Sequence, residues 1–174
     1  MTARMAAVGQ PTARGMIFIH SAPAALCPHL EWAAGMVLGG GVDFEWSDQP
    51  AEPRSRRAEM AWSGDAGIGA ALASKLASFE RVRFEITEDA TPGSDGQRFC
   101  FTPTLGPFSA IVGVHGDILI HEDRIRSVMV GETTGENPIH MALEHLLGTP
   151  WDEELDTFRH ASEDSPVRWL HQVV

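Results

Sequence analysis

Basic residues are scarce in this chain. Its 174 residues include 13 lysines and arginines against 24 aspartates and glutamates, which gives a formal charge of −11 at pH 7. Because nucleic acids attract proteins mainly through their phosphates, such an acidic chain is a poor candidate for nucleic-acid binding. The only dense basic stretch is PRSRR, with Arg54, Arg56 and Arg57, and we interpret it first as a solvated loop.

Cysteines and long hydrophobic runs are also scarce. The two cysteines, Cys27 and Cys100, form no C-x-x-C motif, and we expect free thiols rather than a disulfide. No apolar run approaches the roughly 18 residues that are needed to cross a membrane. The apolar run MAAV near the N-terminus is too short for a secretory signal. We therefore expect a cytoplasmic protein without membrane contact.

The hydrophobic pattern predicts a single α+β domain. Hydrophobic residues make up 43% of the chain, which is enough to build a core. We expect a mobile extension at residues 1–14, where no periodic pattern occurs, and one domain at residues 15–174. From residue 16 to residue 86 the pattern switches between the strand period and the helix period, in the order strand, helix, strand, strand, helix, strand.

This order is that of the split βαββαβ arrangement, and it predicts a ferredoxin-like core at residues 15–88. Strands are expected at residues 16–20, 42–46, 58–62 and 82–86, and helices near residues 28–38 and 66–79. Strands that are apolar on one side only are typical of an antiparallel sheet with helices on one face. Residues 89–174 are expected to add a strand at 98–102, a hairpin from FSAIVGV to ILI, and short helices around EDRIRSVMV, NPIHMALEHLL and WDEELDTF.

The segment HSAPAALCPHLE concentrates reactive side chains between the first strand and the first helix. His20, Cys27 and His29 could supply three ligands of a metal ion, with His115 or His121 as a fourth. Alternatively, Cys27 could act as a nucleophile at a helix N-terminus, with His29 or His20 as its base. The spacing H-x6-C-x-H matches no known zinc pattern. We favour a strand end, a turn and a helix start, and we assign no catalytic residue, metal or cofactor.

Two other motifs resemble ligand sites. SGDAGIGA, at residues 63–70, follows a strand and opens a helix, as phosphate-binding loops do. No lysine follows it closely, however, and Asp65 would repel an anion. HMALEH places His140 and Glu144 four residues apart, a spacing that can share a metal. We favour a tight turn packed against the sheet for the first motif and an amphipathic packing helix for the second.

The polar sides of the expected strands form the candidate binding surface. Together with the PRSRR arginines it comprises Glu45, Arg54, Arg56, Arg57, Glu59, Arg83, Glu85 and Arg98. Cross-strand ion pairs explain these charges if the face is open to water. If the C-terminal half folds over the face, the charges would line a polar cleft. Trp151 and Trp169 are candidates for the core or for a contact between subunits of an oligomer.

Five stretches of the chain resemble a known protein family. With HSAPAALCPHLEWAAG, FTPTLG, HGDILIHEDRIR, WDEELDTFRHA and VRWLHQVV, the chain looks like the actinobacterial domain of unknown function numbered 3145, from residue 12 to the end. The family has no assigned activity, so the resemblance implies no catalytic residue. It implies an actinobacterial cytoplasmic protein, in line with twelve arginines beside one lysine. It also implies a link to type II fatty-acid synthesis, with an acyl carrier protein or a synthase as partner.

These observations predict a non-catalytic binding or regulatory module for a protein or a small ligand. No motif has catalytic spacing, whereas the expected sheet has a charged face. Acyl carrier proteins are acidic, so only the PRSRR arginines, or Arg124 and Arg126, could offer them a complementary surface. The alternatives are an enzyme with Cys27 as nucleophile and a protein that binds a metal at the same segment.

Overall fold

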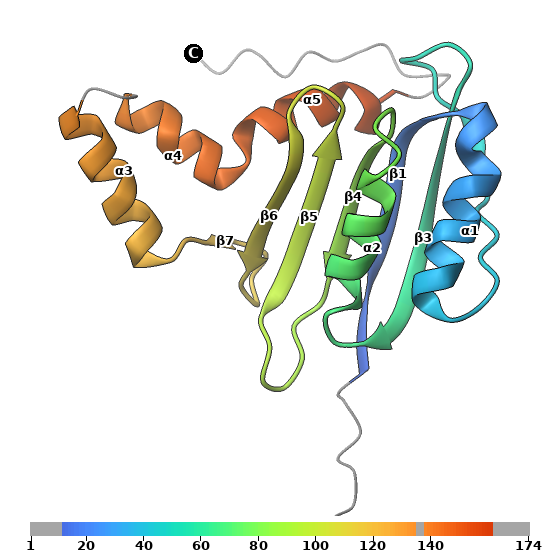
Figure 1. Ribbon diagram of the computed structural model, residues 1–174, viewed down its shortest axis with the longest axis horizontal. Helices are drawn as coiled ribbons and strands as arrows, with labels where there is room; N and C mark the ends of the chain where they lie inside the picture. Colours follow the sequence, from blue (N-terminus) through green and yellow to red (C-terminus); the bar gives the residue numbers. More distant parts are fainter. Residues whose placement is uncertain (1–11, 135–137, 162–174) are drawn as a thin grey trace, which may run out of the picture.

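The computed structural model describes residues 12–134 and 138–161 (Figure 1). Within these residues, seven strands form one antiparallel sheet in the order β2-β3-β1-β4-β5-β6-β7. The strands are β1 (Thr12–Pro23), β2 (Ser47–Asp48), β3 (Ser55–Asp65), β4 (Arg83–Glu88), β5 (Gly96–Thr102), β6 (Gly106–Val112) and β7 (Ile118–Leu119). The helices are the 3-10 turn η1 (Ala24–Leu26), α1 (Cys27–Leu38), α2 (Ile68–Ala77), α3 (Glu122–Thr134), α4 (Ile139–Leu147) and α5 (Thr149–Arg159). The predicted α+β class is confirmed.

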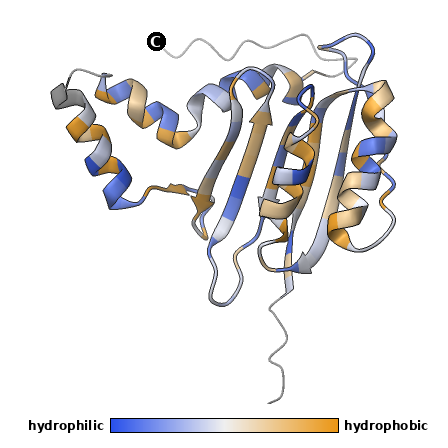
Figure 2. Ribbon diagram, in the orientation of Figure 1, coloured by the Kyte–Doolittle hydropathy of each residue, from blue (hydrophilic) through white to orange (hydrophobic). Residues whose placement is uncertain are grey.

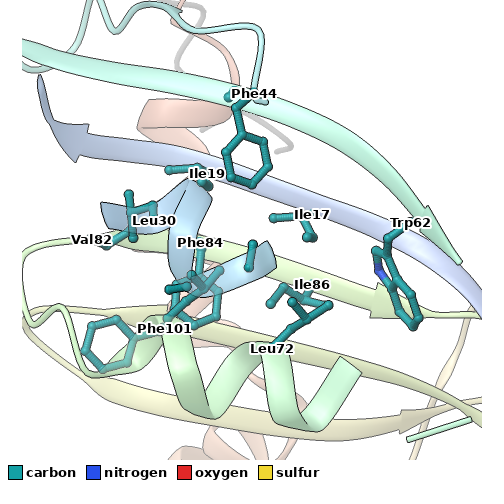
Figure 3. Close-up of a cluster of buried hydrophobic side chains, with 14 of the residues drawn as sticks. Ile17, Ile19, Leu30, Phe44, Trp62, Leu72, Val82, Phe84, Ile86 and Phe101 are labelled. Atoms are coloured by element: carbon teal, nitrogen blue, oxygen red, sulfur yellow. The ribbon is translucent and has the colours of Figure 1, made fainter. Parts of the chain in front are cut away.

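Helices α1 and α2 cover one face of the sheet and bury the main core (Figures 1 and 3). Ile17 and Ile19 of β1 and Phe84 and Ile86 of β4 are fully or almost fully buried there, together with Leu72 of α2. Successive side chains of a strand point to opposite faces, so every second residue of these strands reaches the helices. The residues between them are left for the other face.

Helix α5 packs on the opposite face and builds a second, smaller core. Trp151 and Leu155 of α5 are buried against Cys100 of β5 and Phe108 of β6. The Trp151 indole Nε1 donates a hydrogen bond to the carbonyl oxygen of Gly106, at 2.9 Å. Trp151 is therefore a core residue, which was one of the two roles that the sequence left open. Trp169 lies outside the described residues.

Helices α3 and α4 extend beyond β6 and β7, away from the centre of the sheet (Figure 1). Hydrophobic and hydrophilic bands alternate along them, as expected of helices with one apolar side (Figure 2). Residues 122–131 and 139–147 of these helices include no buried residue. None of the described helices is both long enough and apolar enough to span a lipid bilayer.

The strand that the sequence predicts at residues 42–46 does not form. The Glu31 carboxylate of α1 accepts hydrogen bonds from the backbone N–H of Phe44, at 3.2 Å, and from the indole Nε1 of Trp46, at 2.8 Å. These bonds attach the segment to the helix, and only Ser47–Asp48 pair with β3. The alternating pattern is genuine, because Phe44 is buried in the main core. It arises from packing beside a helix and not from a strand ladder.

Strand β1 begins earlier than the sequence predicts. Thr12, Ala13 and Arg14 pair with residues 63–65 of β3, and the Ala13 side chain is buried. Residues 12–14 therefore belong to the sheet and not to the extension expected at residues 1–14. Residues 1–11 and the final VRWLHQVV lie outside the described part of the chain.

The glycine-rich turn before α2 holds a carboxylate of the protein itself. Glu88 of β4 is only 4% exposed. Its Oε1 accepts a hydrogen bond from the backbone N–H of Gly67, at 2.7 Å, and its Oε2 accepts one from Gly69, at 2.8 Å. Free N–H groups at the start of a helix are the groups that bind phosphate in other proteins. Here Glu88 takes that position, and the segment is the tight turn that we favoured.

We expect Glu88→Gln to lower the free energy of unfolding by about 1–3 kcal/mol, because a glutamine amide can accept only one of the two backbone hydrogen bonds. Urea unfolding followed by circular dichroism measures this loss. The matched control is Glu80→Gln, at an exposed position after α2, which should change stability by less than about 0.5 kcal/mol. Equal stability of the two variants would show that Glu88 does not hold the turn.

Candidate functional site

A cavity of about 820 Å³ opens on the sheet face that α1 and α2 leave uncovered. The side chains that enter it from the strands are Phe18 and His20 of β1, Glu59 of β3 and Glu85 of β4. They alternate with the core residues and so leave the sheet on its other side. Arg57 of β3, residues 45–47, and Phe158 and Arg159 at the end of α5 also line it. This volume is in the range of small-molecule sites.

Two polar side chains hold the end of α5 above the cavity. The amide Nε2 of the buried Gln49 donates hydrogen bonds to the carbonyl oxygens of His20, at 2.6 Å, and Phe158, at 3.2 Å. The guanidinium of Arg57, in β3, donates to the carbonyl oxygen of Ala161, at 2.5 Å. A segment more than 100 residues later in the chain is thus attached to β1 and β3. These hydrogen bonds fix the position of the end of α5, which forms one wall of the cavity.

Four charged side chains form a network between the sheet and α5. Glu85 accepts hydrogen bonds from Arg98, at 2.8 Å, and from Arg159, at 2.6 Å. Asp152 accepts from the same two arginines, at 2.5 Å and 2.8 Å. Two positive and two negative groups balance, which is the condition under which charges are tolerated in a largely buried position. We call Glu85, Arg98, Asp152 and Arg159 the charge network.

The network keeps its two carboxylates ionised. Burial alone would raise the pKa of Glu85, but the neighbouring His20 imidazole and the charges of Arg98 and Arg159 lower this pKa well below its usual range. For Asp152, burial likewise acts to raise the pKa, and the hydrogen bonds from the two arginines lower it. Neither carboxylate is suited to accept or donate a proton near neutral pH.

His20 brings to the cavity a buried nitrogen that makes no hydrogen bond with the described residues. Its side chain is 10% exposed, and its ring lies nearly parallel to that of Phe18, with 6.1 Å between the centroids. Nε2 lies 3.5 Å from Oε2 of Glu85, close enough for an ion pair if the imidazole is protonated. It makes no hydrogen bond with any described residue. An unpaired buried polar atom costs about 1–3 kcal/mol and calls for a specific explanation.

The structure places His20, Cys27 and His29, the residues of the metal and nucleophile hypotheses, in different surroundings. His20 faces the cavity, Cys27 is buried at the first residue of α1, and His29 is exposed on that helix. Burial, and then the Glu31 carboxylate, raise the pKa of the Cys27 thiol, which disfavours the thiolate. Across the described residues, no group of three or more histidine, cysteine or acidic side chains is placed to hold a metal ion. The geometry therefore supports neither hypothesis.

The second cysteine is no better suited to chemistry. Cys100 is 2% exposed in the small core beneath α5. Burial raises the pKa of its thiol to about 12. Both cysteines are free, as the sequence predicts, and both fit a structural role as small buried side chains.

Half of the residues predicted for the binding surface line the cavity. Glu45, Arg57, Glu59 and Glu85 all line it, and Arg98 lies against Glu85 in the charge network. The C-terminal half thus folds over the polar face through α5, which is the second of the two arrangements that the sequence allowed. The polar cleft expected in that case is present.

The remaining three residues of that surface have other surroundings. Arg83 forms ion pairs with Glu52, at 3.2 Å, and with Glu154, at 3.1 Å. Arg56 pairs with Asp48 at 2.7 Å, and both side chains are largely exposed. Arg54 lies in the exposed loop before β3 with a backbone φ of 66°. Arg56 and Arg57 therefore bind separate partners within the chain.

The charged residues that α5 contributes to the site were not predicted from the sequence. Asp152, Leu155 and Arg159 are spaced three and four residues apart, so they share one side of the helix. A buried leucine between two charges of opposite sign could have indicated a helix that faces a charged surface. Phe158 and Gln49 carried no such signal, because their contacts join segments far apart in the chain.

The fold and the cavity define an α+β protein with an antiparallel sheet and a polar pocket between that sheet and a C-terminal helix. The chain matches, over residues 16–172, the family model described as "Protein of unknown function (DUF3145)". It belongs to this family, as the resemblance in its sequence predicted. No curated protein and no solved structure matches the chain.

Proposed function

We propose that this protein is a non-catalytic binding protein whose cavity takes a small organic ligand. The observation that carries the proposal is His20, which is buried in a cavity of about 820 Å³ with no hydrogen-bond partner for Nε2 among the described residues. A ligand with a polar atom at this position would remove the cost of the unpaired nitrogen. The aromatic rings of Phe18, Trp46 and Phe158 in the cavity walls would contact its apolar part.

Binding without catalysis agrees with the protonation chemistry of the site. A general acid or base is most effective when its pKa lies near the working pH. The pKa values of Glu85 and Asp152 are lowered, and those of Cys27 and Cys100 are raised. Each of these groups therefore stays in one protonation state around neutral pH.

The cavity is also built from well-anchored parts, which favours binding. Its strands β1, β3 and β4 lie in the interior of the sheet. Trp46 is held by Glu31, and Phe158 is held through Gln49. A preformed site loses little conformational entropy when a ligand enters, so more of the contact energy appears as affinity.

We also propose a ferredoxin-like core and a cytoplasmic location for this protein, as predicted from its sequence. Within the larger sheet, the order β2-β3-β1-β4 with α1 and α2 on one face supports a ferredoxin-like core. Two free, buried cysteines support a reducing compartment such as the cytoplasm. An acidic carrier protein as partner gains no support from the PRSRR arginines, because Arg56 and Arg57 are already engaged within the chain. We therefore propose a small ligand, and not a carrier protein, as the binding partner.

We expect His20→Phe to abolish ligand binding without destabilising the protein. Phenylalanine keeps an aromatic ring of similar size against Phe18 but has no polar atom to bind a ligand. Because Nε2 makes no hydrogen bond and Glu85 keeps both arginines of the charge network, the midpoint of thermal unfolding should change little. A thermal-shift screen of the full chain against a fragment library, repeated with the variant, measures both effects.

The matched control is His29→Phe, at an exposed position on α1 outside the cavity. Fragments that stabilise the wild-type protein should stabilise this control equally and the His20→Phe variant not at all. If the same fragments stabilise all three proteins, they bind elsewhere and the cavity is not the site.

A further inference from the structure

The arginines that line the cavity are engaged within the protein. Arg159 donates to both carboxylates of the charge network. Arg57 directs its guanidinium to the carbonyl oxygen of Ala161, at 2.5 Å. An anionic ligand would have to compete with these bonds, and a lost partner in a largely buried ion pair is costly.

Two carboxylates that line the same cavity have no such engagement. Glu45 and Glu59 belong to the cavity wall, are exposed, and take part in no ion pair or side-chain hydrogen bond with the described residues. The charge network is neutral, so Glu45 and Glu59 against the single charge of Arg57 leave the cavity with an excess of negative charge. The net charge of the whole chain, −11, adds a long-range field that attracts cations.

Aromatic rings stand beside these carboxylates. Phe18, Trp46 and Phe158 all line the cavity. The faces of such rings attract organic cations, with about 0.5–2 kcal/mol for each contact. The Phe158 ring already has the guanidinium of Arg83 at 4.4 Å from its centroid. Trp46 is fixed by the hydrogen bond from its indole Nε1 to Glu31, at 2.8 Å.

We propose that the cavity takes an organic cation, namely an amine with an apolar body. Its ammonium group would bind on the side of Glu45 and Glu59, its apolar body would lie against the aromatic rings, and a polar atom would meet Nε2 of His20. The buried Nε2 of His20, which makes no hydrogen bond with the described residues, is the observation, independent of Glu45 and Glu59, that indicates a ligand here. This inference rests on the proposed binding function and specifies the chemistry of the ligand.

Three probes of nearly equal shape test the charge preference. They are the phenethylammonium ion, 3-phenylpropanoate and 2-phenylethanol, each titrated into the full chain and followed by NMR. We expect the ammonium ion to bind about tenfold more tightly than the alcohol and the carboxylate to bind most weakly. Glu59→Gln should weaken the ammonium ion by about five- to tenfold and leave the alcohol unchanged. The control Glu80→Gln, at an exposed position that does not line the cavity, should change neither.

The outcomes separate this inference from the proposed function. Suppose the alcohol or the carboxylate binds as tightly as the ammonium ion and His20→Phe removes that binding. The cavity is then a ligand site, and the preference for a cation is wrong. Suppose instead that no probe binds at about 10 mM, well above the millimolar dissociation constants expected for fragments. The cation proposal is then overturned, whereas the fragment screen with His20→Phe and His29→Phe decides on the binding function.

Discussion

Replacing Arg98 by alanine should lower the free energy of unfolding by about 3–5 kcal/mol. Arg98 is the one residue of β5 that reaches both carboxylates of the charge network, and its side chain is 13% exposed. Without it, Glu85 and Asp152 share Arg159 as their only arginine, and the largely buried Glu85, 14% exposed, loses one of its two charged hydrogen-bond donors. Urea unfolding followed by circular dichroism and tryptophan fluorescence measures the loss.

The matched control for this substitution is Arg126→Ala on α3. Arg126 also pairs with a carboxylate, that of Glu122, but both side chains are 68% exposed or more. Exposed pairs contribute about 0–1 kcal/mol, so the control should lose little stability. Similar losses in both variants would mean that burial does not decide the strength of the network.

The same variant should also respond differently to acid. The folded-state pKa values of Glu85 and Asp152 lie below their usual range. Their contribution to stability is therefore complete above the unfolded pKa, about 4, and disappears as the pH falls through the lower folded values. The stability of the wild-type protein should fall steeply below about pH 5, and Arg98→Ala should show a shallower fall. Parallel curves would contradict this assignment.

Gly15→Ala should prevent folding or cost more than about 4 kcal/mol of stability. A Cβ atom at this position of β1 would lie 1.8 Å from the carbonyl oxygen of Thr87, in the neighbouring strand β4, and 2.8 Å from the indole Nε1 of Trp62. The first of these atoms belongs to a paired backbone, which cannot move without breaking the contact between β1 and β4. Soluble yield and the circular dichroism spectrum measure the effect.

Gly41→Ala is the matched control. Gly41 is exposed, and a Cβ atom there would have no neighbour within 4 Å. The control should fold normally, with a change in stability within about 0.5 kcal/mol. A Gly15→Ala variant that unfolds at the same urea concentration as this control would show that β1 and β4 lie further apart than described.

The candidate site was partly visible in the sequence. Alternation along the strands placed Glu59 and Glu85 on one polar face, because the two-residue period is a property of each strand alone. At residues 42–46 the same rule failed as a prediction of a strand. Phe44 alternates there because Glu31 holds its segment beside α1, and no periodicity distinguishes that packing from a strand ladder.

The sequence by itself determined the α+β class, most of the strands and helices, and which strand residues share the charged face. All of these follow from spacing within one element. Only the tertiary structure decided that α5 crosses this face, that Arg159 lies 2.6 Å from Glu85, and that His20 lines a cavity and makes no hydrogen bond there through Nε2. The bond between Arg159 and Glu85 joins residues 74 positions apart. Contacts at such separations depend on how whole helices and strands pack against one another. Local residue patterns do not predict that packing.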